Sequence, residues 1–517
     1  MSNESYFSAC EEIAYSLNGI DSVEKANRII KSISARYGLD KIPKRSDILK
    51  YVKDESIRHM LTIRPARSAS GIIVISAMPM PYACPHGRCI YCPGGIESNT
   101  ANSYTKSSPA TIVAQRYNFD PYMQVRSKLE KFNEYGHDTS KVEIVIVGGT
   151  FLFMPKIYQE YFIKACYDAL NGFIANSLEE AINANEHAYC RNVGLTIETK
   201  PDYCKMEHID LMLRYGATKV EIGVQTLNNK VYEIVNRGHD LEDVINAFKA
   251  ARDSGYKIVA HMMPGLPGSS LKEDYNSFIQ LFSDPRFKPD MMKIYPTLVI
   301  KDTKLEEMYM RGEYKPYSEE DMINLLIEVK RKIPRWMRIM RMQREVDKEE
   351  IITGVKHGNI RQLVLERLNK MGEKCNCIRC REAGLKHAKI DNANIIKEEY
   401  EASDGKEFFI SLEDEDTLLG FVRLRLPSKD AHRDEIRGFR SAIVRELHVY
   451  GRALALGERD PSSYQHKGYG ALLMNEAENV ALKHKREKII VISAIGTREY
   501  YKRLGYILEG PYMVKYL

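Results

Sequence analysis

Three cysteines, Cys84, Cys89 and Cys92, lie close together and are followed by a Pro-Gly-Gly turn. The short gaps and the turn direct three thiols toward one point. Three thiolates can hold an iron–sulfur cluster and leave one iron without a protein ligand. Because an open iron can bind a small molecule, the spacing indicates a reactive cluster. A zinc ion that takes a fourth ligand from elsewhere in the chain is the alternative.

A second group of thiols is formed by Cys375, Cys377 and Cys380. Their spacing is too tight for core packing alone, and a structural zinc site requires four ligands. His387 downstream and His357 upstream are the two candidates for the fourth ligand. We expect zinc here, with the role of tying two large domains together.

A glycine-containing loop near the C-terminal end precedes an apolar helix, and its candidate binding residues are Gln465, Lys467, Gly468, Tyr469 and Gly470. Glycines let backbone N–H groups approach a diphosphate at a helix N-terminus. The preceding strand-like run carries Glu446, Leu447, His448 and Val449, and the next one is followed by Tyr500 and Tyr501. The glycine pattern alone is weak evidence, but these neighbours strengthen it.

The elements that must position the first cysteines are strand-like runs that alternate with helical stretches, at 72–76, 142–147, 194–198, 219–224, 257–262, 291–295 and 337–340. Many are rich in Val and Ile with little alternation, as buried parallel strands are. This predicts an α/β fold with a partial (β/α) barrel. Sites on such barrels lie at the C-terminal strand ends, which here carry Gly148, Gly149, Thr150, Glu198, Lys200 and Gln225.

The rest of the chain divides by composition. We expect a basic helical segment at 1–68, the barrel at 69–345, a zinc-binding linker at 346–395 and an α+β domain at 396–517. In the last domain the pattern predicts strands at 407–412, 417–426, 442–450 and 488–493, a helix at 468–483, and a final helix and strand.

Bulk composition fits a soluble globular protein, with 517 residues, 44% hydrophobic and 28% charged residues. No apolar run reaches the roughly 20 residues of a membrane span. The start, Met1-Ser-Asn-Glu-Ser, lacks the basic and apolar regions of a secretory signal. Cysteine triplets do not suit a disulfide framework. We therefore expect a reducing, cytoplasmic location and no membrane partner.

Positive charge is concentrated in two stretches. Residues 36–67 hold nine basic and four acidic residues, and residues 331–344 hold six basic and no acidic residues beside the single tryptophan, Trp336. Focused positive charge with an aromatic neighbour suits a phosphate backbone and stacked bases. Solvated helix faces are the alternative, but two such stretches in one chain favour nucleic acid.

The first triplet resembles the motif of the radical S-adenosylmethionine enzymes, although four residues rather than three separate Cys84 and Cys89. The resemblance implies a [4Fe-4S] cluster whose open iron binds S-adenosylmethionine, and an adenosyl radical formed after electron transfer. Gly148, Gly149 and Thr150 resemble that family's contact with the methionine end. Glu198, Lys200 and Gln225 are weaker candidates, because polar residues at strand ends also cap loops.

The C-terminal loop and its strand resemble the GCN5-related (GNAT) acetyltransferases, in which the loop cradles the pyrophosphate of acetyl-CoA. Tyr500 matches the tyrosine that commonly reaches the sulfur or carbonyl region in that fold. Of the neighbouring Tyr500 and Tyr501, one is expected only to pack.

The two modules together resemble the family of the catalytic subunit of Elongator, tRNA wobble-uridine carboxymethyl-forming enzymes, over nearly the whole chain. The short gap between Cys84 and Cys89 is typical of archaeal or bacterial members. The stretches that carry the resemblance include Arg64–Gly71, Lys141–Phe151, Arg445–Gly451 and Tyr500–Tyr506.

That resemblance implies a radical on the methyl group of acetyl-CoA, its addition to C5 of the uridine, and thioester hydrolysis to a carboxymethyl group. Lys141 resembles a position that contacts acetyl-CoA from the barrel, which would place the thioester between the two modules. The implied partners are the tRNA anticodon region, acetyl-CoA and an unidentified electron donor, with a homodimer left open. A protein lysine acetyltransferase with a structural cluster and a non-catalytic tRNA-binding scaffold are the alternatives.

Overall fold

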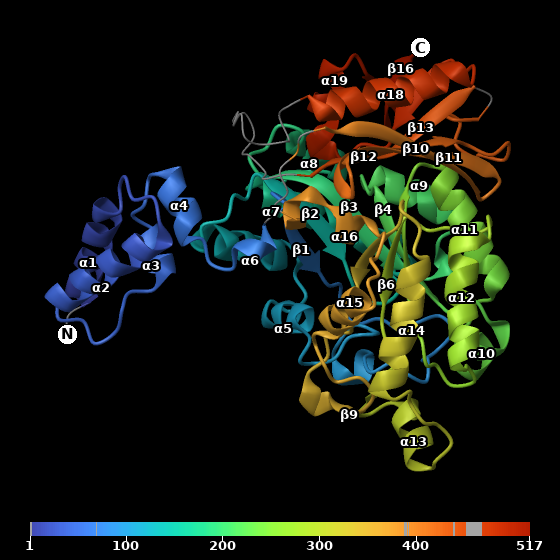
Figure 1. The fold of residues 1–517 in the computed structure, drawn as a ribbon, viewed down its shortest axis with the longest axis horizontal. Coiled ribbons are helices and arrows are strands. Elements are labelled where there is room, and N and C mark those ends of the chain that lie inside the picture. The colour runs from blue at the N-terminus through green and yellow to red at the C-terminus, as the bar shows by residue number, and fades with distance from the viewer. Residues whose placement is uncertain (1–2, 69, 387–389, 391, 438–439, 451–467) are drawn as a thin grey trace.

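The computed structural model describes residues 3–68, 70–386, 390, 392–437, 440–450 and 468–517. A small helical unit at the N-terminus stands to one side of a central barrel, and a C-terminal domain covers one end of that barrel (Figure 1). Among the described residues, no helix has the length and apolar character needed to cross a membrane.

The N-terminal unit consists of α1 (Asn3–Ser16), α2 (Val23–Arg36), α3 (Arg45–Leu49) and α4 (Glu55–Leu61). It has a hydrophobic core of its own, to which Ile13, Leu17 and Ile30 contribute. Helices α2 and α4 begin at side-chain caps, Ser22 and Asp54, that accept backbone N–H groups.

The central sheet has seven parallel strands in sequence order: β1 (Ile73–Ala77), β2 (Lys141–Ile146), β3 (Arg191–Thr199), β4 (Lys219–Gln225), β5 (Lys257–Met262), β6 (Met291–Ile294) and β8 (Arg338–Arg341). All seven strand-like runs of the sequence are therefore strands. This confirms the predicted partial barrel.

Helices follow the strands and cover the outside of the barrel (Figure 1): α5 (Pro109–Arg116), α6 (Pro121–Glu134), α7 (Lys156–Asn171), α8 (Leu178–Asn185), α9 (Met206–Arg214), α10 (Asn229–Ile234), α11 (Leu241–Asp253), α12 (Leu271–Ser283) and α14 (Glu319–Lys332). Helix α13 (Lys304–Met310) projects beyond one end of the barrel. Fully buried strand residues such as Ile144, Ile197 and Val220 pack against the covering helices. Side chains alternate along a strand, so the intervening residues line the inside of the barrel.

A connecting region follows the barrel. It contains β9 (Ile351–Thr353) and the helices α15 (Ile360–Lys370), α16 (Ile378–Arg381) and α17 (Ala383–Lys386). Strand β9 pairs with β7 (Val299–Ile300), which lies between β6 and β8 in the chain.

The C-terminal domain is a second seven-stranded sheet in the order β10 (Asn394–Ala402), β11 (Gly405–Asp414), β12 (Thr417–Leu426), β13 (Ser441–Val449), β14 (Lys488–Val491), β16 (Tyr512–Tyr516) and β15 (Ile507–Glu509). Helices α18 (Tyr469–Lys483) and α19 (Arg498–Arg503) complete it. Strand β10 was not predicted, because its charged residues hide the alternation; pairing with β11 decides its conformation.

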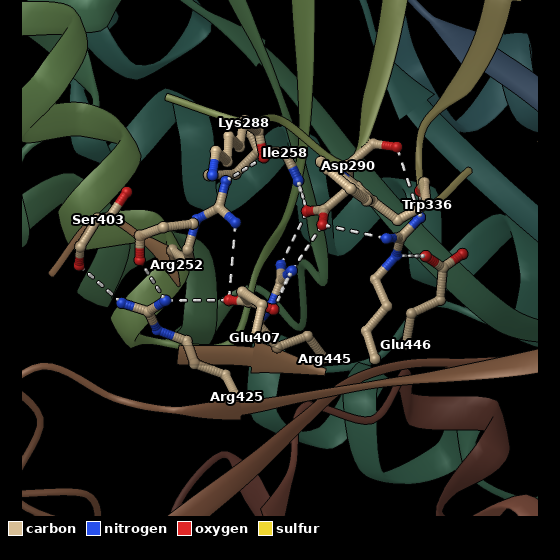
Figure 2. A network of polar contacts seen from close by, with 12 residues as sticks. Arg252, Ile258, Lys288, Asp290, Trp336, Ser403, Glu407, Arg425, Arg445 and Glu446 are labelled. Atoms are coloured by element: carbon tan, nitrogen blue, oxygen red, sulfur yellow. Dashed lines mark hydrogen bonds and ion pairs between the residues drawn. The ribbon is translucent and has the colours of Figure 1, made fainter. Parts of the chain in front are cut away.

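The C-terminal domain packs on the N-terminal ends of the barrel strands through a buried layer of charges (Figure 2). Arg445 donates to both carboxylate oxygens of Asp290, at 2.8 and 2.6 Å, and to Glu407. Arg425 joins Asp253 of α11 to Glu407. A buried charge is tolerated only when it is paired and hydrogen-bonded, so these contacts hold the two domains in one relative position.

The second basic stretch also belongs to this interface. Arg335 forms ion pairs with Glu398 and Glu413, and Arg338 with Glu382. Trp336 stacks on Tyr400 with ring centroids 4.2 Å apart. The prediction that residues 331–344 form a free nucleic-acid-binding patch is therefore wrong for these residues, because acidic side chains distant in sequence neutralise them.

Candidate active sites

Cys84, Cys89 and Cys92 line one cavity at the C-terminal ends of the barrel strands. Their sulfur atoms do not form a group within 4.8 Å of one another, whereas those of the second triplet do. Ligands of one zinc ion lie at 2.0–2.3 Å from it, so the wider spacing favours a cluster over zinc. Burial and the neighbouring cysteines raise the pKa of Cys84 to about 11, while Arg237 and Lys200 oppose this shift.

The predicted glycine segment after β2 forms part of the same cavity. Gly148 has φ +114°, and a Cβ there would lie 2.7 Å from the Cβ of Ala101, so no larger residue fits. Its N–H donates to Glu198 Oε2 at 3.1 Å. The hydroxyl of Thr150 is buried without a hydrogen-bond partner, and Gly149 lies beside it in the cavity wall. An unsatisfied polar atom at this place fits a bound ligand.

The three weaker candidates from the strand ends, Glu198, Lys200 and Gln225, also line the cavity. Gln225 holds a left-handed backbone conformation, φ +73°, and its Oε1 is buried without a partner. Such strain is concentrated at functional sites. Lys200 lies 3.0 Å from Nδ1 of His86 and 3.1 Å from Asp202.

Two arginines of the cavity were missed by sequence reasoning as site residues. Arg237 donates to the carbonyl of Gly223 at 2.8 Å and lies 3.7 Å from Cys89 Sγ, and its Nε has no partner. Only its place in the loop after α10 could have drawn attention to it. Arg344 was assigned to the basic stretch, yet it lines the cavity and donates to the carbonyl of Ser103 at 3.1 Å.

A charged group forms the floor of the cavity. His261 Nε2 lies 2.7 Å from Glu221 Oε2, and Lys293 pairs with the same oxygen. Burial favours the neutral carboxyl, but Lys293 and His261 outweigh it and hold the pKa of Glu221 well below its usual range. Glu221 is therefore anionic in the folded protein.

The charged residues continue along the inside of the barrel toward the C-terminal domain. Lys219 pairs with Glu143, which also accepts from Thr196 at 3.0 Å. Burial lowers the pKa of Lys257 to about 8, and Glu446 of β13 opposes the shift. TIM-barrel interiors are dominated by bulky branched residues; here charged side chains lie on the inside at several levels, beside apolar neighbours such as Val145 and Val259.

The second site lies where β13 and β14 part. Their ladder ends at the pair Val444 and Val491, and a bulge in β13 follows at Arg445. A Cβ on Gly470 would lie 2.5 Å from the hydroxyl of Tyr500 and 3.9 Å from Leu447. This hydroxyl is buried without a partner at the first turn of α18. A helix N-terminus with a free hydroxyl beside it suits a thioester linked to a diphosphate.

The remaining predicted residues of this site differ in position. Tyr501 lies in the core, with ring centroids 5.3 Å from Tyr500 and 6.0 Å from Tyr506. His448 contacts the ring of Tyr450, and Tyr469 packs against the same core. Val449 ends β13. Gln465 and Lys467 lie outside the described residues.

Lys141 begins β2, at the barrel end that faces the C-terminal domain, and burial lowers its pKa. Strand β2 has six residues, which at about 3.3 Å per residue separate Lys141 from Gly148 by roughly 20 Å. The two sites therefore lie at opposite ends of the barrel strands, which the sequence did not indicate.

The second triplet brings Cys375, Cys377 and Cys380 together, with all three sulfurs within 4.8 Å of one another. The Nζ of Lys330 lies 3.3 Å from Cys375 Sγ. Hydrogen bonds from the other two cysteines hold the pKa of Cys377 well below its usual range. His357 pairs with Glu319, which speaks against it as a ligand, and His387 lies outside the described residues.

Comparisons with known proteins agree with this architecture. Family models match at residues 78–282 (Radical SAM superfamily), 289–370 (Radical_SAM C-terminal domain), 379–506 (Acetyltransferase (GNAT) family) and 6–69 (ELP3 N-terminal domain).

Curated relatives match over nearly their whole length. The chain is 43% identical to Elongator complex protein 3 of Danio rerio, over 95% of this chain and 93% of that protein. It is 46% identical to the tRNA uridine(34) acetyltransferase of Methanocaldococcus jannaschii, over 92% and 90%. The solved structure of Methanocaldococcus infernus Elp3 with an N-terminal deletion matches with a TM-score of 0.77 and 42% identity, over 87% of this chain and all of that one.

Proposed function

The chain belongs to the family of Elongator complex protein 3 and the tRNA uridine(34) acetyltransferases, and we propose from this premise how its two sites divide one reaction. The enzyme is a tRNA uridine acetyltransferase with radical S-adenosylmethionine and acetyltransferase domains. We propose that it transfers the acetyl group of acetyl-CoA to C5 of the wobble uridine, and that thioester hydrolysis leaves 5-carboxymethyluridine.

The observation that carries this proposal is the pair of sites on one rigid body. Buried ion pairs between the domains, such as Arg445 with Asp290, fix the distance between the cysteine cavity and the second site beside Tyr500. An acetyl thioester held by the C-terminal domain would have to reach through the barrel to the cysteine cavity, where S-adenosylmethionine would supply the radical chemistry. The polar row from Glu446 through Lys219 to Glu221 supplies an inside surface compatible with such a route.

The cavity residues fit the cofactors of the radical step. Cys84, Cys89 and Cys92 would hold the [4Fe-4S] cluster, and unsatisfied Thr150 and Gln225 would meet S-adenosylmethionine together with Gly148 and Gly149. When bound, this pair supplies the one-electron chemistry that an unreactive methyl group requires. Around it, Arg237 and Lys200 provide positive charge beside the thiolates.

The residues of the second site fit acetyl-CoA. Gly468 and Gly470 open the N-terminus of α18 to the pyrophosphate, and Gln465, Lys467 and Tyr469 would flank it. Tyr500 would donate to the thioester oxygen. The edge of β13, with Glu446, Leu447, His448 and Val449, would guide the pantetheine arm, and Lys141 would contact it from the barrel.

Three further assignments complete the proposal. The basic stretch 36–67 would bind the tRNA backbone, because exposed Lys41, Lys44 and Lys53 carry positive charge outside the barrel. The second triplet would bind zinc, with its fourth ligand outside the described residues. The enzyme would act in the cytoplasm and receive electrons from a separate donor, and a homodimer is open to test.

The decisive experiment incubates the iron–sulfur-reconstituted protein anaerobically with S-adenosylmethionine, acetyl-CoA, a reductant and tRNA, and identifies nucleosides by mass spectrometry. The wild type should form carboxymethyluridine. Cys89→Ser should form none yet bind tRNA with unchanged affinity, because the substitution leaves the basic stretch in the N-terminal helical unit unchanged. Full product from Cys89→Ser would refute the radical route. Acetylation of peptides without S-adenosylmethionine would instead support the protein acetyltransferase alternative.

A further inference from the structure

His86, which lies between two of the cavity cysteines in sequence, forms a bridge from a charged side chain to a cysteine sulfur. Its Nε2 lies 3.3 Å from Cys89 Sγ, and its Nδ1 lies 3.0 Å from Nζ of Lys200. Lys200 follows β3, and its Nζ also donates to Asp202 at 3.1 Å. Residues from two separate loops therefore meet at one imidazole ring.

The partners determine which ring nitrogen carries the hydrogen. A lysine ammonium has three donors and no acceptor. Nδ1 of His86 must therefore accept from Lys200, and in a neutral imidazole the other nitrogen is then the donor. Nε2–H points at Cys89 Sγ as an N–H···S hydrogen bond. Burial lowers the pKa of Lys200, and Asp202 opposes this shift. The hydrogen bond to Asp202 also keeps the ammonium in place.

The backbone around the ring supports a built arrangement. Gly238 has φ +70°, and a Cβ there would lie 2.3 Å from the Cβ of His86, so any larger residue would displace the ring. Asn236 donates to the carbonyl of His86 at 3.4 Å. The position of the His86 ring is thus fixed by the close approach of Gly238 and by the hydrogen bond from Asn236 to the carbonyl of His86.

The hydrogen bonds to the three sulfurs are unequal. Cys89 Sγ faces His86 and also Arg237, whose Nη1 lies 3.7 Å away. Cys92 Sγ accepts backbone N–H groups, from Ser103 at 3.2 Å and from Gly94. The side-chain donors His86 and Arg237, by contrast, both face Cys89.

We propose that His86, held in one tautomer by Lys200, is a positioning residue that raises the reduction potential of the iron–sulfur cluster through its hydrogen bond to Cys89. Hydrogen bonds to the sulfurs are one of the factors that set the potential of such clusters. The reduced cluster carries one more negative charge, and an N–H dipole aimed at a ligand sulfur stabilises that charge. This inference rests on the proposed cluster and leaves the rest of the proposed function aside.

The test is an anaerobic redox titration of the reconstituted full chain without tRNA or acetyl-CoA. The reduced cluster is monitored by electron paramagnetic resonance. His86→Phe should lower the one-electron equilibrium constant of reduction at least tenfold, about 59 mV in midpoint potential. His86→Gln, which keeps an N–H donor, should recover part of this loss. Lys200→Met should also lower the potential, while Lys205→Met, an exposed lysine of the same loop, should leave it unchanged.

An unchanged potential in His86→Phe with full iron content would overturn the proposal. If that variant does not assemble a cluster, a measurement on the wild type still tests the proposal. In protein labelled with ¹⁵N-histidine and transferred to D₂O, pulsed electron paramagnetic resonance of the reduced cluster should show one coupled histidine nitrogen and its exchangeable deuteron. Absence of that coupling would overturn the proposal. Loss of tRNA product in the wild type would refute the proposed function but not this hydrogen bond.

Discussion

The buried carboxylate Asp290 gives the sharpest test of how the two domains are joined. It accepts from both terminal nitrogens of Arg445 and, at 2.9 Å, from the backbone N–H of Ile258, and Arg423 lies 3.6 Å away (Figure 2). Asp290→Asn keeps the size of the side chain but removes its charge. The new amide N–H₂ would then face a guanidinium that can only donate.

The magnitude follows from burial, since Asp290 and Arg445 are both 0% exposed. Removing one partner of a buried pair leaves an uncompensated charge and costs about 3–5 kcal/mol. For a domain of about 120 residues, which lies between the two size classes, each kcal/mol lowers Tm by about 4 °C. We expect the transition of the C-terminal domain to fall by roughly 12–20 °C.

The matched control is Lys249→Ala. Lys249 pairs with Asp404 and Asp430 across the same interface, but both carboxylates are 70% exposed. Surface pairs contribute about 0.2–1 kcal/mol, so this variant should barely change Tm. Differential scanning calorimetry of both variants is the assay, because a chain of several domains need not unfold in one step.

Stability against pH provides an independent check. The arginines hold the pKa of Asp290 far below its usual value despite burial. A depressed folded-state pKa stabilises the protein above the unfolded pKa of about 3.9, and this stabilisation is lost as pH falls below it. The difference in the free energy of unfolding between wild type and Asp290→Asn should therefore be largest at neutral pH and shrink below pH ~4. A neutral-pH cost under about 1 kcal/mol would refute the buried-charge account of this interface.

Two further predictions concern the separate sites. Tyr500→Phe removes the unsatisfied hydroxyl next to Gly470. The KM for acetyl-CoA should therefore rise or kcat fall about tenfold, with no change in cluster content. Unchanged kinetics would make Tyr500 a packing residue. Cys377→Ser should abolish stoichiometric zinc, measured by elemental analysis of protein expressed with zinc, and should lower Tm. Cys166→Ser changes a buried thiol outside both triplets and should keep the metal. Zinc retained by Cys377→Ser would contradict this assignment.

Local sequence determined the elements and the chemistry of the single motifs. Seven runs rich in Val and Ile became the parallel barrel, because buried strands need such residues wherever they lie. Cys84, Cys89 and Cys92 share one cavity because their separations are short enough for the loop itself to bring them together. The glycines at 148 and 470 were recognisable because a backbone that must approach another group closely tolerates no side chain.

Tertiary structure alone decided which distant residues meet. Arg335 and Trp336 suggested a nucleic-acid surface, and partners more than 60 positions away, Glu413 and Tyr400, turned them into an interface. Lys200 and Arg237 reach the loop of His86 and Cys89 from two other loops, and no spacing in the chain records that approach. The physical reason is that side-chain charge and hydrogen bonding act through space, so their meaning depends on neighbours that only the folded chain provides.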